Sequence, residues 1–206
     1  MQKMGYIPAV FAAYLLGCSS MALYIAKRKQ VDLRSGGSGN LGTSNVVAVI
    51  GWAEGFLVAL HDVGKGALAV FLAQLCFPAL PEIGVVAGVA CVLGHIFPFY
   101  LKFRGGKGLA AFIGMTLVLN WKLAAIAVAL MLLVTLITDY LVIGTAVVVL
   151  VVPAYLAIVQ QRMPAALIVC IGTAVILWKH RENYVRILKG TEIGLRSGAK
   201  GDYRVK

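Results

Sequence analysis

Glycines and small polar residues are concentrated in residues 36–45, which read Gly-Gly-Ser-Gly-Asn-Leu-Gly-Thr-Ser-Asn. Glycine readily adopts positive φ, and successive backbone N–H groups can then converge on one anion. An apolar helix is expected from Val46, and its first N–H groups would face the same anion. The stretch therefore predicts a phosphate loop, with a flexible loop as the alternative interpretation.

A second glycine-rich stretch carries three cations, Lys102, Arg104 and Lys107, and follows Gly94-His95 in an apolar run. Lys107 stands among glycines, so its ammonium can approach a ligand without crowding. Position 101 is Leu and no Ser or Thr follows Lys107, which argues against a Walker A loop. The alternative roles are contact with lipid headgroups for the cations and an interior hydrogen bond for His95.

A third polar motif, His180-Arg181-Glu182-Asn183, lies near the C-terminus, with Gly190-Thr191-Glu192 beyond it. His180 and Asn183 are three positions apart, so on a helix they share a face. This arrangement would let the imidazole and the amide act on one ligand. A solvated helix end is the alternative interpretation.

Glu54, His61 and Lys65 form a fourth polar group within apolar sequence. At 3.6 residues per turn these three lie within about 40° of one another on a helix, with Asp62 close by. Ionisable residues in or near a membrane span generally face the interior of the bundle and pair there. We therefore expect a structural ion pair between Asp62 and Lys65.

Taken together, the motifs predict an anionic ligand, most simply a phosphate ester, that is met at a membrane surface. The sequence contains no Gly-x-Ser-x-Gly elbow, so a covalent Ser or Cys intermediate is not indicated. The four cysteines are dispersed, without metal-ligand spacing or a disulfide framework, and no metal site is expected.

The elements that position these motifs are predicted to be membrane helices. Of the 206 residues, 61% are hydrophobic and only 13% are charged, whereas soluble proteins carry about 25% charged residues. The net charge is +11, but the basic residues lie in the gaps between apolar runs. That placement is typical of membrane topology rather than of nucleic-acid binding, so no nucleic-acid partner is expected.

Apolar runs recur along the chain, at residues 5–26, 46–60, 63–80, 83–97, 109–120, 123–138, 140–159 and 164–178. About 20 apolar residues are needed to cross the bilayer, and the runs that begin at Val46, Ile83 and Leu109 are short enough to be re-entrant or tilted. The polar residues within positions 61–65 are expected to break the helix between the second and third runs. The pattern predicts an all-α integral membrane bundle of about seven transmembrane helices.

The orientation of this bundle follows from its basic residues. Lys and Arg gather in residues 27–45, in residues 98–108 and in the C-terminal stretch, whereas the opposite side has only Lys3, Lys122 and Arg162. Positive charge is retained in the cytoplasm, so we expect the N-terminus outside and the C-terminus in the cytoplasm. We expect one transmembrane domain over residues 1–193 and a basic cytoplasmic tail over residues 194–206.

The ordered motifs resemble those of the PlsY family, the membrane acyl-phosphate:glycerol-3-phosphate acyltransferases of bacteria. The matching segments are 37–40 with Asn45, 62–66, 94–98, 105–108, 180–183 and 190–192. The resemblance runs from about Leu15 to Glu192. It implies seven spans with an external N-terminus, in agreement with the charge pattern.

The resemblance also implies an activity. A fatty acyl group would pass from acyl phosphate to the 1-hydroxyl of glycerol 3-phosphate, giving lysophosphatidic acid and phosphate in the first step of phospholipid synthesis. Neither acyl-CoA nor a metal or other cofactor would take part. The protein would be a monomer in the bacterial cytoplasmic (inner) membrane, in contact with membrane lipid, with its active site facing the cytoplasm.

By resemblance, four residues of the first motif form a phosphate cradle: Ser38, Gly39, Asn40 and Asn45. The other substrate-binding candidates are Arg104, Lys65 and His95. The catalytic candidates are Lys107, which would neutralise charge, and His180 with Asn183, which would orient the acceptor or stabilise developing charge. Acyl phosphate is already activated, so the site mainly has to hold two phosphates and shield an oxyanion. A substrate phosphate oxygen is a candidate proton acceptor.

The sequence departs from the family where an arginine usually follows Asn45, because position 48 is Ala48, and where residues 51–54 replace a Gly-Lys-rich stretch. Arg104 also stands where lysine is more usual. Losing one charged phosphate contact costs about 1.5–3 kcal/mol. One alternative is therefore a divergent paralogue that acylates another acceptor. Two further alternatives are a transporter of phosphorylated metabolites, which would need polar residues at mid-membrane, and a lipid-binding scaffold.

Overall fold

The computed structural model describes residues 5–196, and these residues form helices, turns and loops with no strand among them. The prediction of an all-helical chain is thus confirmed for the described part. The helices are α1 (Tyr6–Cys18), α2 (Met21–Lys29), α3 (Thr43–Val49), α4 (Trp52–Cys76), α5 (Ile83–Ile96), α6 (Leu109–Leu119), α7 (Trp121–Thr138), α8 (Leu141–Ile158), α9 (Met163–Lys179) and α10 (Arg181–Leu188). Most of the predicted tail, from residue 197 onward, lies outside the described residues.

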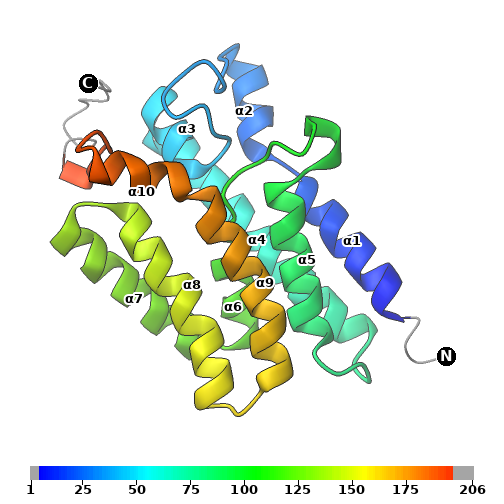
Figure 1. Cartoon of the computed structure of the whole chain (residues 1–206). Helices are drawn as coiled ribbons and strands as arrows, with labels where there is room; N and C mark the ends of the chain where they lie inside the picture. The colour runs from blue at the N-terminus through cyan, green and yellow to red at the C-terminus, as the bar shows by residue number, and fades with distance from the viewer. Residues whose placement is uncertain (1–4, 197–206) are drawn as a thin grey trace. The chain divides into compact units, whose positions relative to one another are not determined.

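The chain divides into two compact units. The first is Met1–Trp121, which contains α1 to α6, and the second is Lys122–Lys206, which contains nearly all of α7 and then α8 to α10. Figure 1 shows α1 to α6 in blue to green and α7 to α10 in yellow-green to orange.

Several helices are long and apolar enough to cross a membrane, namely Tyr6–Lys29, Trp52–Cys76, Ile83–Leu101, Trp121–Thr138 and Leu141–Ile158. A sixth span arises if α9 and α10, which bend by 45° at their junction, count together. Helix α6 is apolar but shorter. A multi-pass membrane protein is therefore supported by the described residues, while the predicted number of seven spans stays a prediction.

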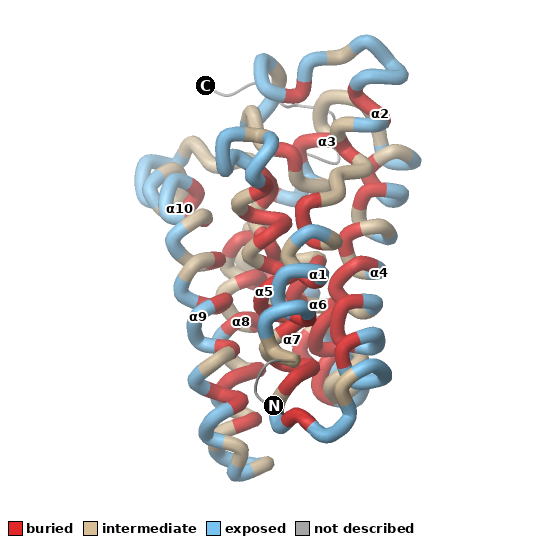
Figure 2. Tube along the Cα trace, turned by 90° about the vertical axis from the view of Figure 1, so that its right-hand side faces the viewer, coloured by how far each residue is buried: buried red, intermediate tan, exposed pale blue. Residues whose placement is uncertain are grey.

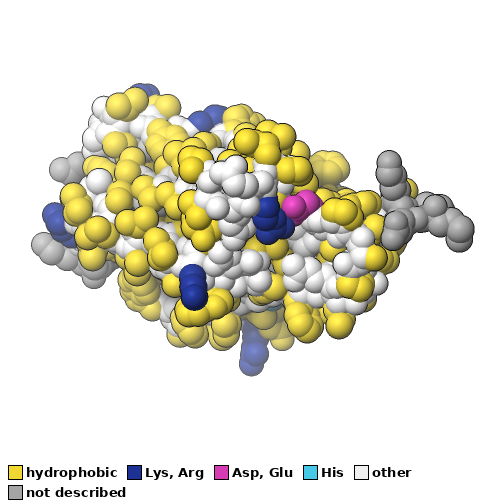
Figure 3. Space-filling view, turned by 90° about the horizontal axis from the view of Figure 1, so that it is seen from below, with side chains coloured by type: hydrophobic (Ala, Val, Ile, Leu, Met, Phe, Trp, Pro, Cys, Tyr) yellow, Lys and Arg dark blue, Asp and Glu magenta, His cyan; other side chains and the backbone are white. Residues whose placement is uncertain are grey.

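Helix α4 is exposed along one side and buried along the other (Figure 2). Its exposed side carries large apolar residues, namely Trp52, Phe56, Leu57, Leu60, Leu68, Phe71, Leu72 and Leu75. Its buried side contains the charged residues Asp62 and Lys65. A helix surrounded by water shows the reverse arrangement, so the exposed side of α4 is suited to lipid. Apolar side chains also predominate on the face drawn in Figure 3.

The predicted break at residues 61–65 is wrong, because α4 runs continuously from Trp52 to Cys76. These polar groups do not end the helix because they are buried against neighbouring segments: Lys65 Nζ donates a hydrogen bond to the Ser19 carbonyl, just after α1. The break lies earlier, at Gly51. Its φ of 144° separates the short helix α3 from α4.

Glycines allow the helices of the first unit to pack closely. Gly66 on α4 lies against the backbone of Ala111 on α6, and Gly17 on α1 lies against the backbone of Cys91 on α5. A Cβ at either glycine would overlap that backbone. Small residues at such crossings are characteristic of helices packed in a membrane, where association depends on close van der Waals contact.

In the second unit, α8 and α9 pack against each other. The Thr173 hydroxyl on α9 donates a hydrogen bond of 2.7 Å to the Val149 carbonyl on α8. Helix α9 ends at Lys179, and the chain bends at His180 into α10, which is amphipathic rather than apolar. The bend places the third polar motif at the end of the apolar helix.

Candidate active site

The glycine loop, residues 34–42, connects α2 to α3 and is held in place by Asn45 on α3. The Asn45 Oδ1 atom accepts hydrogen bonds from the Ser38 backbone N–H at 2.7 Å and from the Ser38 hydroxyl at 3.3 Å. Its Nδ2 atom donates to the Leu33 carbonyl at 2.9 Å. Gly37 has a φ of 55°, and a Cβ there would overlap Asn45. Asn45 is buried and thus organises the loop, while its predicted phosphate contact stays a prediction.

Ser38, Gly39 and Asn40 form the turn at the centre of the glycine loop. The Gly39 N–H donates to the Gly36 carbonyl at 3.0 Å, and the Asn40 side-chain oxygen accepts from the Gly42 N–H at 2.8 Å. Such local bonds pre-organise a loop. Ser38 is exposed, so its hydroxyl is accessible to a ligand.

The lysine loop, residues 102–108, folds back onto the end of α5. The Gly105 N–H donates to the Ile96 carbonyl at 2.9 Å, and the Gly106 N–H donates to the His95 carbonyl at 3.1 Å. These bonds satisfy carbonyls that the end of a helix leaves open. The N–H groups of Gly105 and Gly106 are therefore already used as donors and are not available to bind an anion.

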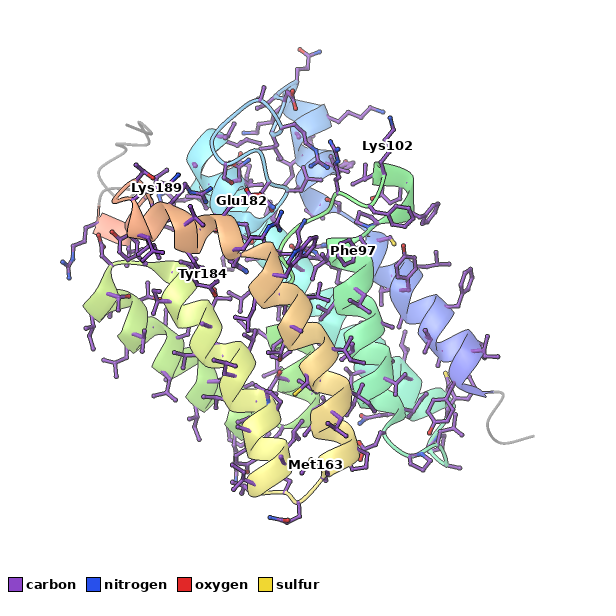
Figure 4. The ribbon with its side chains drawn as sticks, in the orientation of Figure 1. Phe97, Lys102, Met163, Glu182, Tyr184 and Lys189 are labelled. Atoms are coloured by element: carbon purple, nitrogen blue, oxygen red, sulfur yellow. The ribbon has the colours of Figure 1, made fainter. Side chains whose placement is uncertain are left out.

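The cations of the lysine loop have different surroundings. Lys102 is exposed and points away from the helices (Figure 4). Lys107 is half-buried and stands just before Gly108, whose φ of 98° leads into α6. Arg104 is exposed, and its carbonyl accepts a hydrogen bond from the guanidinium of Arg34 in the glycine loop. The two loops are therefore tied together at one end of the first unit.

A buried ion cluster, defined by Asp62 and Lys65 on α4 and His95 on α5, lies next to the lysine loop. The Lys65 Nζ atom is 2.7 Å from Asp62 Oδ1 and 2.9 Å from His95 Nδ1. His61 Nδ1 is 3.2 Å from the same Asp62 oxygen. The three members of the cluster are exposed by only 3%, 4% and 8%, so the charges can be held there only as a compensated group. The predicted pairing of Asp62 with Lys65 is confirmed.

Glu54 does not belong to this cluster, so its predicted grouping with His61 and Lys65 is wrong. Its carboxylate forms an ion pair with Lys29 at the end of α2. Glu54 and His61 share a face of α4, but two turns of a helix separate them by roughly 10 Å along the axis. The nearer cation from α2 is therefore the partner.

In the second unit, His180 and Asn183 lie at the junction of α9 and α10 and are both buried. The His180 Nδ1 atom is 2.8 Å from the Ile176 carbonyl, so this nitrogen carries a proton and donates it. The Asn183 Nδ2 atom donates to Glu192 Oε1 at 2.6 Å. The orientation of both candidate catalytic side chains is thus set by hydrogen bonds.

The Glu192 cluster, defined by Asn183, Arg186 and Glu192, is the polar group around this junction. The Arg186 Nε atom donates to Glu192 Oε2 at 2.6 Å, so one carboxylate holds a site residue and a cation together. The chain beyond Glu192 is anchored as well. The Leu195 N–H donates to the Asp139 carbonyl at 2.7 Å, and the Arg196 N–H donates to Asp139 Oδ1 at 2.9 Å.

Three residues that organise these sites received no role from the sequence: Arg34, Asp139 and Glu192. Glu192 has a visible signal, because it lies within the polar segment Gly190-Thr191-Glu192 that follows the His180 motif. Arg34 and Asp139 have none, since each acts on a segment remote in sequence. Within residues 5–196, no group of three or more His, Cys, Asp or Glu side chains is arranged to hold a metal ion.

Comparison with known proteins gives consistent matches along the chain. A family model described as glycerol-3-phosphate acyltransferase matches residues 7–190. A glycerol-3-phosphate acyltransferase of Coxiella burnetii is 38% identical over 190 residues, which is 92% of this chain and 97% of that protein. One from Clostridioides difficile is 37% identical over 198 residues, covering 93% and 96% of the two chains.

Solved structures match in three dimensions as well. The crystal structure of PlsY (YgiH), an integral membrane glycerol 3-phosphate acyltransferase, in its glycerol 3-phosphate form gives a TM-score of 0.89 at 30% identity, covering 95% of this chain and 98% of that one. Its lysophosphatidic acid form gives a TM-score of 0.84 at 30% identity, covering 92% and 94%.

Proposed function

The chain belongs to the glycerol-3-phosphate acyltransferase family, and on that premise we propose that it transfers a fatty acyl group from acyl phosphate to the 1-hydroxyl of glycerol 3-phosphate. The products are lysophosphatidic acid and phosphate, and the reaction opens phospholipid synthesis. The observation that carries this proposal is the match of nearly the whole chain to an acyltransferase structure in its glycerol 3-phosphate form.

The chemistry requires little covalent help from the protein. The hydroxyl oxygen of the acceptor attacks the acyl carbonyl carbon, and the bond from that carbon to the phosphate oxygen breaks. The hydroxyl proton is transferred to a phosphate oxygen. Because phosphate is a good leaving group, the protein mainly has to align the two substrates and stabilise the developing oxyanion.

In the first unit, the glycine loop and the lysine loop supply the groups for this task. Ser38, Gly39 and Asn40 cradle a phosphate, and Lys107 neutralises its charge. The tie between Arg34 and the Arg104 carbonyl supports the assignment, because it holds the two loops at the same end of the unit. For the second unit, considered by itself, the proposed roles of His180 and Asn183 are to orient the acceptor or to stabilise charge.

We also propose a topology of seven spans with the C-terminus in the cytoplasm of a bacterium, and a monomer in its inner membrane. Residues 27–45 and 98–108, which include the glycine loop and the lysine loop, carry seven of the nine Lys and Arg residues of the first unit, and basic residues are retained in the cytoplasm. The acyl donor is amphiphilic and the acceptor is soluble. A site at the cytoplasmic ends of the helices therefore receives one from the bilayer and the other from water.

Ala48 supports a second candidate, in which the acceptor is a different phosphorylated alcohol. Position 48 lies in α3, next to the glycine loop, and an alanine there cannot form a charged contact with the acceptor phosphate. Measuring turnover with a series of phosphorylated alcohols distinguishes this candidate from glycerol 3-phosphate acylation.

The first test is phosphate release from acyl phosphate by the purified protein, with and without glycerol 3-phosphate. We expect acceptor-dependent release that Lys107→Gln lowers by at least about tenfold, because a charged contact to phosphate is lost. Lys102→Gln is the matched control, since it removes an exposed charge from the same loop, and its rate should match the wild type. Absence of acceptor-dependent release from folded protein would refute the proposed reaction.

A further inference from the structure

His95 has one ring nitrogen inside the buried ion cluster and the other against the lysine loop. We propose that His95 is held as the tautomer with its proton on Nε2 and donates that N–H to a phosphate oxygen of a substrate bound at the lysine loop. Lys65 and Asp62 are the positioning residues that hold the tautomer. The proposal rests on the acyltransferase function proposed above, and it specifies that Nε2 of His95 is the hydrogen-bond donor and the substrate phosphate the acceptor.

The tautomer follows from the geometry at Lys65. Its Nζ atom is 2.8 Å from the Ser19 carbonyl, 2.7 Å from Asp62 Oδ1 and 2.9 Å from His95 Nδ1. An ammonium has three N–H groups and no lone pair, so all three are used when His95 Nδ1 accepts from it. The Asp62 Oδ1 atom also faces this nitrogen but lies farther away, at 3.5 Å, so the lysine is the nearer partner of Nδ1. A neutral imidazole that accepts at one nitrogen carries its proton on the other.

The Asp62 carboxylate is what keeps the Lys65 amine charged in this position. A buried ammonium is stable only beside a compensating anion, and Asp62 is the acidic residue at hydrogen-bond distance from Nζ. A His61 nitrogen, 3.2 Å from the same carboxylate oxygen, completes the surroundings of that oxygen. The cluster thus imposes a donor on Nδ1 of His95 and leaves Nε2 to donate.

The Nε2 atom of His95 faces the lysine loop at Gly106. A Cβ at Gly106 would overlap this nitrogen, so only glycine allows the imidazole to occupy its place. Among residues 5–196 the Nε2 atom has no protein hydrogen-bond partner, although the residue is only 8% exposed. The nitrogen itself is not sealed from its surroundings, so its N–H is accessible to a small ligand, and a phosphate oxygen at the lysine loop would accept its hydrogen bond.

Other donors near Nε2 suit the same ligand. The Gly105 and Gly106 amides are used by α5, so the donors of this loop nearest an anion are the Lys107 side chain and the N–H groups in the first turn of α6. Helix α6 is 11 residues long, and the positive end of its dipole favours a phosphate. His95 therefore adds a neutral, directional donor to a cation and a helix end.

Two substitutions at His95 separate this role from a purely structural one. In His95→Gln the amide nitrogen lies near the position of Nε2, whereas in His95→Asn the amide oxygen lies near Nδ1 and the reach to the loop is lost. We expect His95→Asn to raise the KM of one phosphorylated substrate by about tenfold, with a clearly smaller rise for His95→Gln. Asparagine preserves only the acceptor for Lys65 and lacks the donor at the position of Nε2. A KM for His95→Asn that is equal to or below that for His95→Gln would therefore overturn the proposal.

The KM values for acyl phosphate and for glycerol 3-phosphate are measured separately, so the substrate whose KM rises identifies the phosphate that His95 contacts. No rise for either substrate would refute the contact. A thermal unfolding curve for each variant shows whether it is folded, and only folded protein is compared.

The tautomer is tested without turnover by ¹⁵N NMR of histidine-labelled protein in detergent. The chain has three histidines, and the His95 signals are those that disappear in His95→Gln. We expect a protonated Nε2 and an unprotonated Nδ1, with a shift of Nε2 on addition of glycerol 3-phosphate or inorganic phosphate. A protonated Nδ1 would overturn the proposal even if the acyltransferase activity is present, and an inactive wild-type enzyme would refute only the proposed reaction.

Discussion

The buried ion cluster of the first unit and the Glu192 cluster of the second hold candidate site residues in different ways. In the first, Asp62, Lys65 and His95 project from two long helices that pack side by side, and their side chains are 2–8% exposed. In the second, Arg186 and Glu192 have side chains that are 32% and 12% exposed, and the carboxylate comes from a segment beyond the helix. The first arrangement depends on charge balance, and the second depends on a segment remaining docked.

The difference predicts what a substitution in each cluster should change. A buried ion pair that loses one partner leaves an uncompensated charge in a poorly solvated interior, which destabilises the whole helix packing. A cluster at the end of a helix can instead admit water when it is broken, so the loss stays local. Changes to the Asp62–Lys65 ion pair should therefore mainly lower the free energy of unfolding, and changes in the Glu192 cluster should mainly lower activity.

The largest effect is expected for Lys65→Met, which leaves the Asp62 carboxylate buried without its ammonium. The free energy of unfolding should fall by about 3–5 kcal/mol, measured by thermal unfolding in detergent. The double variant Asp62→Leu/Lys65→Met should recover part of this loss, because no unpaired charge remains. Lys29→Met is the matched control, since it removes a lysine whose side chain is 50% exposed, and its unfolding curve should stay close to the wild type. A double variant as unstable as Lys65→Met, or less stable, would break the comparison.

A smaller effect on stability and a clear effect on turnover are expected for Glu192→Ala. This change removes a hydrogen-bond acceptor from both Asn183 and Arg186, so the Asn183 amide is held less firmly. Acyl transfer should fall by about tenfold, while the unfolding temperature falls less than in Lys65→Met. Glu182→Ala on the same helix (Figure 4) is the control, because that carboxylate is 72% exposed and weakly paired. A global loss of stability larger than that of Lys65→Met would contradict the distinction.

The smallest effect is expected at Asp139, which anchors the segment after Glu192. Asp139 has a φ of 70°, a conformation that asparagine also tolerates. Asp139→Ala removes the side-chain acceptor of the Arg196 N–H and should speed hydrogen exchange at residues 195–196, with a loss of turnover of about threefold. Asp139→Asn retains an acceptor oxygen and should lie closer to the wild type. Equal exchange in the two variants would show that the carboxylate does not hold the segment.

Local spacing explains which parts of the two clusters could be predicted. Asp62 and Lys65 are three positions apart, so any helix brings their side chains onto one face, and the pairing follows without knowledge of the fold. The same argument placed His180 and Asn183 together. Glu54 lies on the same face of α4 as His61 but too far from it along the helix axis, and its partner Lys29 comes from another helix.

Contacts between distant segments explain what could not be predicted. The sequence resemblance assigned Asn45 to a phosphate cradle, and its hydrogen bonds to Leu33 and Ser38, which close the glycine loop, were not predicted. The link from Arg34 to the Arg104 carbonyl joins positions 70 residues apart, and no periodicity marks either one. The continuity of α4 through residues 61–65 likewise depends on acceptors supplied by other segments.

The sequence by itself determined that the chain is helical, that lipid surrounds much of it, and in which order its polar motifs occur. Composition and apolar run length decide these properties, because the transfer of side chains and unpaired backbone groups into lipid dominates the free energy. Only the tertiary structure decided which donors remain for a ligand. The amides of Gly105 and Gly106 are used by the end of α5, and Lys65 fixes which nitrogen of His95 can donate. A hydrogen bond depends on the position of both partners within a few tenths of an ångström, and that information exists only once distant segments are packed.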